Sequence, residues 1–232
     1  MRLLDWERLP KRMRNESVRP YYDRLRARKR DLAAKRTMDV AAAAVLTVIL
    51  SPVMLILAIG IKIDSRGPVF FRQERITQYG RSYRIFKFRT MVADADKRGP
   101  AVTTSGDSRI TRMGRLLRKC RLDELPQLFN VLAGDMSFVG TRPEVKKYVD
   151  AYTEEMWATL LLPAGITSKT SIAYKDEDEV MGRYLKEGGS VDEVYIRRVL
   201  PDKMRYNLDY LENFSVIGDI KVMIGTVFAV IR

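Results

Sequence analysis

An apolar run from Val40 to Ile61 constrains this chain more than any other feature of its sequence. A straight helix needs roughly 20 apolar residues to cross the hydrocarbon core of a bilayer, so the run is long enough to enter a membrane. Its length and uniformity argue against a core helix of a soluble domain. The long charged segment before it and the lack of a small-residue cleavage site after it argue against a secretory signal peptide.

Pro52 lies near the middle of this run and directly follows Ser51. Proline removes a backbone hydrogen bond and clashes with the preceding turn, so it kinks a helix. The Ser51 hydroxyl can satisfy a carbonyl that the kink frees. Basic residues, which prefer the cytoplasmic side of a membrane, flank both ends of the run: Lys35, Arg36, Lys62 and Arg66. We therefore expect a re-entrant helix over residues 35–63, broken at Ser51–Pro52, with a plain transmembrane span as the alternative.

The segment ahead of the run is strongly basic. Of the 42 Lys and Arg residues and the 29 Asp and Glu residues in the chain, residues 1–36 hold 13 and 5. Basic residues beside a membrane helix attract anionic lipid headgroups, so residues 1–34 are interpreted as a membrane-surface segment. A solvated, partly disordered tail is the alternative.

The composition restricts the chemistry that the chain can perform. A formal net charge of +13 indicates an anionic partner, which could be nucleic acid, anionic lipid or a phosphorylated substrate. The single Cys120 excludes an internal disulfide, and the absence of His excludes Ser-His and Cys-His nucleophile pairs. Acid–base chemistry must therefore use carboxylates, Lys, Tyr or metal-bound water.

Residues 64–232 are expected to form one domain, mostly helical with a small β element. The patterns predict strands at 69–73 and 82–89, a loop at 93–108, and a helix capped by Thr111. A helix is also expected at 146–161. Residues 137–143 are interpreted as a compact turn that exposes Arg142. The segment from Tyr206 to Arg232 ends in an apolar stretch that suits a core helix or, as we favour, a helix in the membrane interface.

Two adjacent acids, Asp123 and Glu124, follow a series of arginines that recurs every three residues from Arg109 to Arg118. Asp123 is well placed to begin the next helix, since Pro126 is tolerated in a first turn and an apolar stripe follows. A capping Asp with a neighbouring Glu is therefore a purely structural interpretation of the pair. The arginines directly ahead of it make phosphate binding the functional alternative.

Six stretches, taken together and in this order, resemble the bacterial sugar transferases, or monotopic phosphoglycosyl transferases. They are Lys35–Asp39, Ser51–Pro52, Lys87–Met91, Asp107–Gly114, Leu122–Leu132 and Gly134–Pro143. The resemblance implies an α/β catalytic domain on the cytoplasmic face of the bacterial inner membrane. It also implies transfer of a sugar-1-phosphate from a UDP-sugar to undecaprenyl phosphate, with release of UMP, as the first step of O-antigen, capsule or exopolysaccharide assembly.

The resemblance also implies roles for individual residues. Asp123 would form a covalent phosphosugar intermediate, and Glu124 would hold Mg²⁺ on the diphosphate. Phosphate contacts are implied for four basic residues: Lys87, Arg89, Arg118 and Arg142. Family members commonly carry a Gln-Val-x-Gly-Arg segment after Gly-Ile-Thr, whereas this chain continues from Gly165–Thr167 with a different sequence. The nucleotide contacts, the sugar and the glycan pathway therefore stay open.

Two other functions are weighed against this one. A nucleotide-sugar glycosyltransferase could use Asp176 and Asp178 for its metal and would release UDP rather than UMP. A basic nucleic-acid-binding or membrane-scaffold protein would leave Asp123 and Glu124 without a role, so no nucleic-acid partner is expected. UDP-sugar, undecaprenyl phosphate and anionic lipids are the expected partners, and a homo-oligomer is compatible with the sequence.

Overall fold

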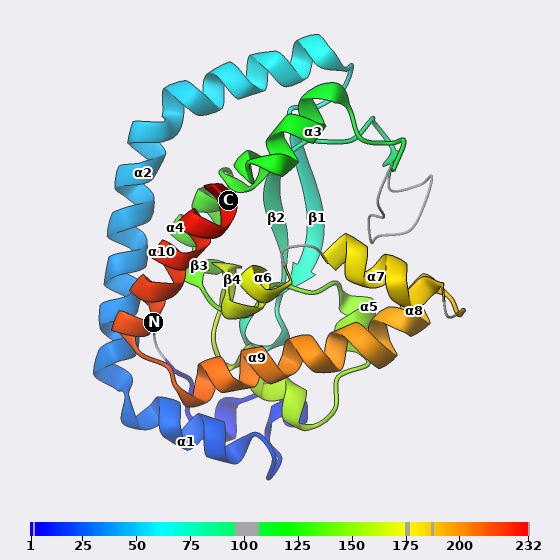
Figure 1. The fold of residues 1–232 in the computed structure, drawn as a ribbon. Coiled ribbons are helices and arrows are strands. Elements are labelled where there is room, and N and C mark those ends of the chain that lie inside the picture. The colour runs from blue at the N-terminus through cyan, green and yellow to red at the C-terminus, as the bar shows by residue number, and fades with distance from the viewer. Residues whose placement is uncertain (2, 96–106, 175–176, 187, 232) are drawn as a thin grey trace.

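The computed structural model describes residues 1, 3–95, 107–174, 177–186 and 188–231. A long helix, α2, runs up one side of the molecule and across its top, and the other elements lie within its curve (Figure 1). Mostly helical structure with two small sheets confirms the predicted α/β class. The helices and strands are α1 (Arg19–Ala27), α2 (Lys29–Asp64), β1 (Phe70–Ile76), β2 (Ser82–Phe88), α3 (Arg112–Lys119), α4 (Gln127–Ala133), β3 (Met136–Val139), α5 (Lys146–Val149), β4 (Ala164–Thr167), α6 (Lys169–Ala173), α7 (Glu177–Leu185), α8 (Val191–Val194), α9 (Leu200–Glu212) and α10 (Val216–Ile231).

Helix α2 has the length and composition of a membrane-crossing helix, and only 11% of its most apolar window is buried. Pro52 lies inside it and has no N–H to donate to the carbonyl of Val48, four residues before. The Ser51 hydroxyl donates to that same carbonyl oxygen at 2.8 Å. The expected compensation for the proline is therefore confirmed, whereas re-entry into the membrane stays a prediction.

The two sheets differ in how well the sequence predicted them. Strands β1 and β2 pair antiparallel, with Phe71 opposite Lys87, as the two expected strands suggest. Strands β3 and β4 pair parallel. Residues 137–139 therefore belong to a strand, and the compact turn expected over residues 137–143 is wrong for these three residues. The two strands meet so closely that a Cβ on Gly165 would lie 2.2 Å from the Gly140 nitrogen, which requires glycine there.

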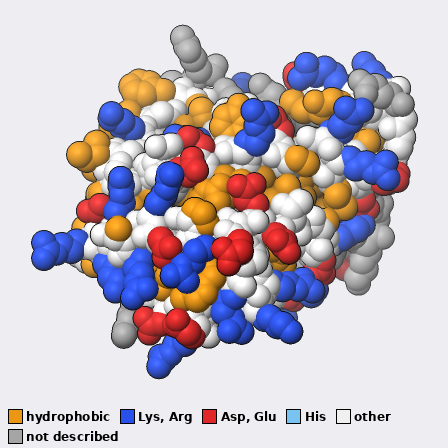
Figure 2. Space-filling view, turned by 90° about the horizontal axis from the view of Figure 1, so that it is seen from below, with side chains coloured by type: hydrophobic (Ala, Val, Ile, Leu, Met, Phe, Trp, Pro, Cys, Tyr) orange, Lys and Arg blue, Asp and Glu red, His pale blue; other side chains and the backbone are white. Residues whose placement is uncertain are grey.

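The N-terminal residues are part of the main hydrophobic core. Leu9, Met13, Val18 and Leu25 are almost fully buried in the same cluster as Tyr148. A solvated, disordered tail is therefore excluded, because these side chains remove apolar surface from water. The face of the molecule below α1 carries cationic side chains interspersed with anionic ones (Figure 2). The proposed boundary at residue 34 stays a prediction.

A buried polar cluster joins α2 to the centre of the domain. Lys35 donates to Asp219 Oδ2 at 2.6 Å, and Asp39 accepts from the Ser137 hydroxyl at 2.7 Å. The Tyr210 hydroxyl donates to the second oxygen of Asp219 at 2.9 Å. Helix α2 is thereby tied to β3, α9 and α10, and β3 leads directly to Arg142.

Two helical expectations need correction. The helix expected over residues 146–161 is split into α5 and a 3₁₀ helix at Glu155–Leu161, and between them the buried Tyr152 ring packs edge-on against Trp157. Helix α10 packs on the core through Asp219 and Val222 and exposes Phe228, and its expected place in the membrane interface stays a prediction.

Candidate active site

The acidic pair lies in a tight turn that two local features produce. Helix α3 begins at the Thr111 cap, whose hydroxyl accepts from the Gly114 amide, as predicted. Arg121 then adopts a left-handed conformation with φ of 54°, which is uncommon for a residue with a side chain. The chain reverses there into a 3₁₀ turn at Leu122–Glu124. Helix α4 starts only after Pro126, so Asp123 does not cap it and the structural interpretation of the pair is wrong.

The turn is held between α2 and β2. Leu122 and Leu125 pack on the cluster that contains Met54 and Leu57 of α2. On the other side, Asn130 of α4 bridges the backbone of β2, accepting from the Phe86 amide at 2.8 Å and donating to the Arg84 carbonyl at 3.0 Å. Asp123 and Glu124 are thus held close to α2, the helix with the length and composition of a membrane segment.

Glu124 is surrounded by cations. Lys87 Nζ donates to Glu124 Oε1 at 2.9 Å, Arg142 Nη2 lies 3.4 Å from the same oxygen, and Arg121 Nη1 lies 3.9 Å from it. Burial alone would raise the pKa of Glu124, but Lys87 and Arg142 outweigh it and lower the pKa to about 2. Glu124 is therefore ionised throughout the physiological pH range.

Asp123 differs from its neighbour in its electrostatic environment. Burial raises its pKa, the charge of Glu124 adds to the increase, and Lys87 and Arg118 oppose it. Two adjacent carboxyls with opposite shifts are typical of a pair whose members have different chemical roles.

The pair faces a large cavity of about 890 Å³. Lys87, Arg118, Arg121 and Arg142 contribute to the lining beside the two acids. The four cations outnumber the two carboxylates, so the site has a surplus of positive charge that suits a polyanionic ligand.

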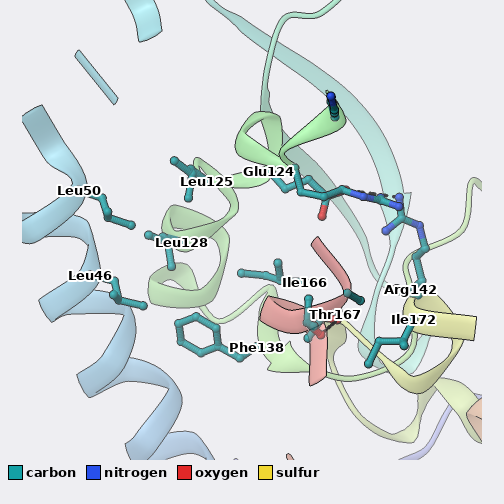
Figure 3. Close-up of a pocket in the computed structure, with 15 residues that line it drawn as sticks. Leu46, Leu50, Glu124, Leu125, Leu128, Phe138, Arg142, Ile166, Thr167 and Ile172 are labelled. Atoms are coloured by element: carbon teal, nitrogen blue, oxygen red, sulfur yellow. Dashed lines mark hydrogen bonds and ion pairs between the residues drawn. The ribbon is translucent and has the colours of Figure 1, made fainter. Parts of the chain in front are cut away.

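A second, mainly apolar pocket of about 240 Å³ adjoins Glu124 from the side of α2. Leu46 and Leu50 of α2 point into it from one side, while Glu124 and Arg142 lie at its opposite end (Figure 3). Leu128, Phe138 and Ile166 complete much of its wall. An elongated apolar ligand with an anionic end would match this gradient from hydrocarbon to cation.

The structure brings most of the predicted site residues together. Lys87 and Arg142 contact Glu124, and Arg118 lines the same cavity. Arg89 is different, because it donates to the carbonyls of Ser65 and Arg66 at 2.7 and 2.9 Å. It thus holds the chain where it leaves α2, and it also lines the cavity, so the expected phosphate contact stays a prediction.

Two features of the site were missed from the sequence. Arg121 was not singled out, and its positive φ is seen only in the folded chain. The apolar pocket joins α2, α4, β4 and α10 and has no signal in any single segment. Of the acids weighed for a metal site, Asp176 and the side chain of Asp178 lie outside the described residues. The described residues contain no group of three or more His, Cys, Asp or Glu placed to hold a metal.

Known proteins align with most of this chain. The bacterial sugar transferase family model matches residues 30–232. A UDP-N-acetylgalactosamine-undecaprenyl-phosphate N-acetylgalactosaminephosphotransferase of Aeromonas hydrophila is 36% identical over 83% of this chain and 42% of its own length. A UDP-glucose:undecaprenyl-phosphate glucose-1-phosphate transferase of Caulobacter vibrioides is 38% identical over 83% of this chain and 68% of its own.

A third relative, exopolysaccharide production protein PSS of Rhizobium leguminosarum bv. phaseoli, is 34% identical over 85% of this chain and 94% of its own length. The chain thus spans less than half of the Aeromonas relative but nearly the whole of the Rhizobium one.

Proposed function

Since the chain belongs to the bacterial sugar transferase family, we propose that it transfers a sugar-1-phosphate from a UDP-sugar to undecaprenyl phosphate and releases UMP. The activities for which the Aeromonas and Caulobacter relatives are named support a polyprenyl phosphate acceptor. The reaction is the step that initiates a surface glycan. The Rhizobium relative, named for exopolysaccharide production, supports that assignment.

One observation carries this proposal. The buried Asp123–Glu124 pair lines a large cavity rich in cations, and Glu124 also lines an apolar pocket that α2 helps to form. The cavity suits a nucleotide diphosphate sugar, whose charges Lys87, Arg118, Arg121 and Arg142 neutralise. The pocket suits the first isoprene units of a lipid, whose phosphate reaches the acidic pair from the opposite side.

In the first step, Asp123 acts as the nucleophile. One of its carboxylate oxygens forms a bond to the β-phosphorus, and the bond from that phosphorus to the bridging oxygen breaks. UMP leaves with the bridging oxygen. Lys87 and Arg142 are placed to stabilise the negative charge that develops on the phosphoryl oxygens.

In the second step, the lipid phosphate accepts the sugar phosphate. An oxygen of undecaprenyl phosphate bonds to the same phosphorus, and the acyl phosphate bond to Asp123 breaks. The Asp123 carboxylate is regenerated, and the product is a polyprenyl diphosphosugar. The positions of the two hollows support this order, since Asp123 lines the cavity and its neighbour Glu124 lines both the cavity and the apolar pocket.

The donor set fits Mg²⁺. The contacts of Glu124 with Lys87, Arg121 and Arg142 all use Oε1, which leaves Oε2 directed elsewhere. Mg²⁺ in phosphate-transferring sites is commonly held by one or two carboxylates together with substrate phosphates and water, so Glu124 would hold the ion. When bound, it supplies charge neutralisation on the diphosphate.

The proposal includes a location at the membrane. Helix α2, with its exposed apolar side chains, inserts into the bacterial inner membrane, re-enters at Ser51–Pro52 and keeps the site on the cytoplasmic face. Exposed Arg24, Arg26 and Lys29 at the base of α2 contact anionic lipid headgroups.

The test uses the full-length protein in detergent with undecaprenyl phosphate and a panel of UDP-sugars. We expect UMP release that requires Mg²⁺ and disappears in Asp123→Asn. Asp150→Asn, which removes an exposed, ion-paired carboxylate that does not line the cavity, serves as the matched control and should keep full activity. Release of UDP instead of UMP, or full activity of Asp123→Asn, would contradict the mechanism.

A further inference from the structure

The large cavity reaches a second polar cluster that the proposed reaction does not use. Glu144, Tyr195 and Lys203 are 5%, 2% and 3% exposed, yet all three line the cavity. The Tyr195 hydroxyl donates to Glu144 Oε1 at 2.6 Å. Lys203 Nζ lies 3.2 Å from the same oxygen and 2.7 Å from the Tyr195 hydroxyl.

Separate parts of the chain hold this cluster rigidly. The Glu144 carbonyl accepts from the Ile76 amide at the end of β1. Tyr195 begins a π-helical turn, a feature often found at functional sites, and its ring stacks on Tyr148 with centroids 4.3 Å apart. Lys203 comes from α9. Burying the charges of Glu144 and Lys203 costs free energy, and apolar side chains in their place would stabilise the fold as well.

The cluster lies close to the phosphate-binding residues. Only Pro143 separates Glu144 from Arg142, so the two Cα atoms are at most ~7 Å apart. A hexose is bonded directly to the β-phosphate that Arg142 faces, and its ring therefore lies in this part of the cavity. The opposite end is bounded by Phe88, Met91 and Val92, which suit a flat base better than a polyol.

We propose that Glu144, Tyr195 and Lys203 form the hexose subsite and select the sugar that is transferred. This inference rests on the proposed function. Each hexose hydroxyl is both a donor and an acceptor, and the cluster offers a carboxylate, an ammonium and a phenol in a fixed arrangement. A buried polar site of this kind strongly rejects an analogue that leaves its groups unpaired, so the configuration of the hexose hydroxyls decides which sugar binds.

The experiment compares the wild-type chain with Tyr195→Phe and Lys203→Met. UMP release is measured with UDP-glucose, UDP-galactose and their N-acetylated counterparts, and UDP, which lacks the sugar, is measured as a competitive inhibitor. We expect kcat/KM for the preferred sugar to fall about 10- to 100-fold and the preference among sugars to narrow. The inhibition constant of UDP should change less than about twofold, since its phosphates and base stay bound elsewhere.

Tyr22→Phe is the matched control, because it removes a buried tyrosine hydroxyl, bonded to the Leu4 carbonyl, away from the cavity. An equal loss for UDP and UDP-sugars would place the nucleotide at this cluster and overturn the proposal. Unchanged sugar preference with only a lower melting temperature would make the cluster structural and would also overturn it.

Failure of the proposed function is a separate result. It would be a wild-type protein that releases no UMP from any UDP-sugar. Calorimetry then still decides the subsite, through the affinity of each UDP-sugar relative to UDP in the wild type and in Tyr195→Phe. If the wild type binds a UDP-sugar more tightly than UDP and Tyr195→Phe abolishes this difference, the hexose subsite is supported. If Tyr195→Phe leaves the ratio of the two affinities unchanged, the proposal is overturned.

Discussion

Two charged clusters lie along α2, and they differ in how far their charges are buried. The α2-anchor cluster is Lys35, Asp39 and Asp219, with side chains at most 1% exposed. The catalytic cluster is Lys87, Arg142, Asp123 and Glu124, in which the Lys87 side chain is 22% and the Arg142 side chain 29% exposed. The α2-anchor cluster is enclosed by the protein, whereas the catalytic cluster opens into the cavity.

The balance of charge separates the two clusters further. In the α2-anchor cluster one ammonium faces two carboxylates, and neutral donors supply the rest: the Ser137 and Tyr210 hydroxyls and the Phe138 amide. Burial raises the pKa of Asp219, and Lys35 opposes the increase. In the catalytic cluster Arg118 and Arg121 line the same cavity as Lys87 and Arg142, so four cations face two carboxylates. On the proposed function, this surplus of positive charge, rather than the presence of a buried ion pair, distinguishes a phosphate site from an anchor.

The largest effect expected on this comparison is that of Lys35→Met on stability. Removing the ammonium leaves Asp219 and Asp39 buried without compensation, which typically costs 3–5 kcal/mol, as a rough range. Thermal unfolding in detergent should show a large fall in melting temperature, with little change in KM of the remaining folded enzyme. Lys29→Met, at an exposed position, is the control. An unchanged melting temperature with a raised KM would mean that the anchor takes part in substrate binding.

Lys87→Met should act on activity rather than on stability. Loss of one donor to a developing phosphoryl charge typically lowers kcat by about 10²- to 10³-fold. Glu124 keeps Arg142 and Arg121 as partners, so unfolding should change little. Lys146→Met, which removes an exposed lysine paired with Asp150, is the control. A large loss of stability with retained turnover would make Lys87 a second anchor.

The pH dependence should also separate the paired carboxyls. Asp123 must be ionised to attack, and its pKa is raised, so kcat/KM should fall as pH decreases through a value above the ordinary Asp range of about 4. Glu124 has a depressed pKa of about 2, so its contribution to stability is present above its unfolded pKa and is lost as pH falls from about 4.5 toward 2.

Lys87→Met sharpens this test, because Lys87 lowers the pKa of both acids. Its removal should move the acidic limb of kcat/KM to higher pH. A limb that stays in place would show that Asp123 is not the group being titrated.

The smallest expected effect concerns the proline in α2. Ser51→Ala removes the hydroxyl that bonds the Val48 carbonyl and should cost about 0.5–1.5 kcal/mol in thermal unfolding. Thr47→Ala is the matched control, since the Thr47 hydroxyl donates to the Ala43 carbonyl without a proline at the next turn. An equal cost in both variants would contradict a special role for Ser51.

The sequence was informative where the signal was local. The hairpin of β1 and β2, the Thr111 cap and the Ser51 bond to Val48 each depend on residues close together in the chain. The gathering of Lys87, Arg118 and Arg142 around the acidic pair came from the resemblance to a family, because nothing in the spacing alone brings β2, α3 and the end of β3 together.

The features that the sequence did not predict have a common physical origin in long-range contacts. Arg89 bonds backbone carbonyls at the end of α2, and a carbonyl partner leaves no trace in the sequence. Strands β3 and β4 are four residues each and pair only because Gly140 and Gly165 allow close approach. The burial of Met13 and Leu25 was hidden because basic residues dominate the segment around them.

The measurement that most directly tests the account is the search for a covalent adduct. The full-length protein is incubated with its preferred UDP-sugar in the absence of lipid phosphate, and the intact chain and its peptides are weighed by mass spectrometry. We predict an increase equal to one sugar phosphate on the peptide that contains Asp123, absent in Asp123→Asn and discharged by undecaprenyl phosphate. An adduct on another residue, or turnover to the lipid product in Asp123→Asn, would contradict a central role for the acidic pair.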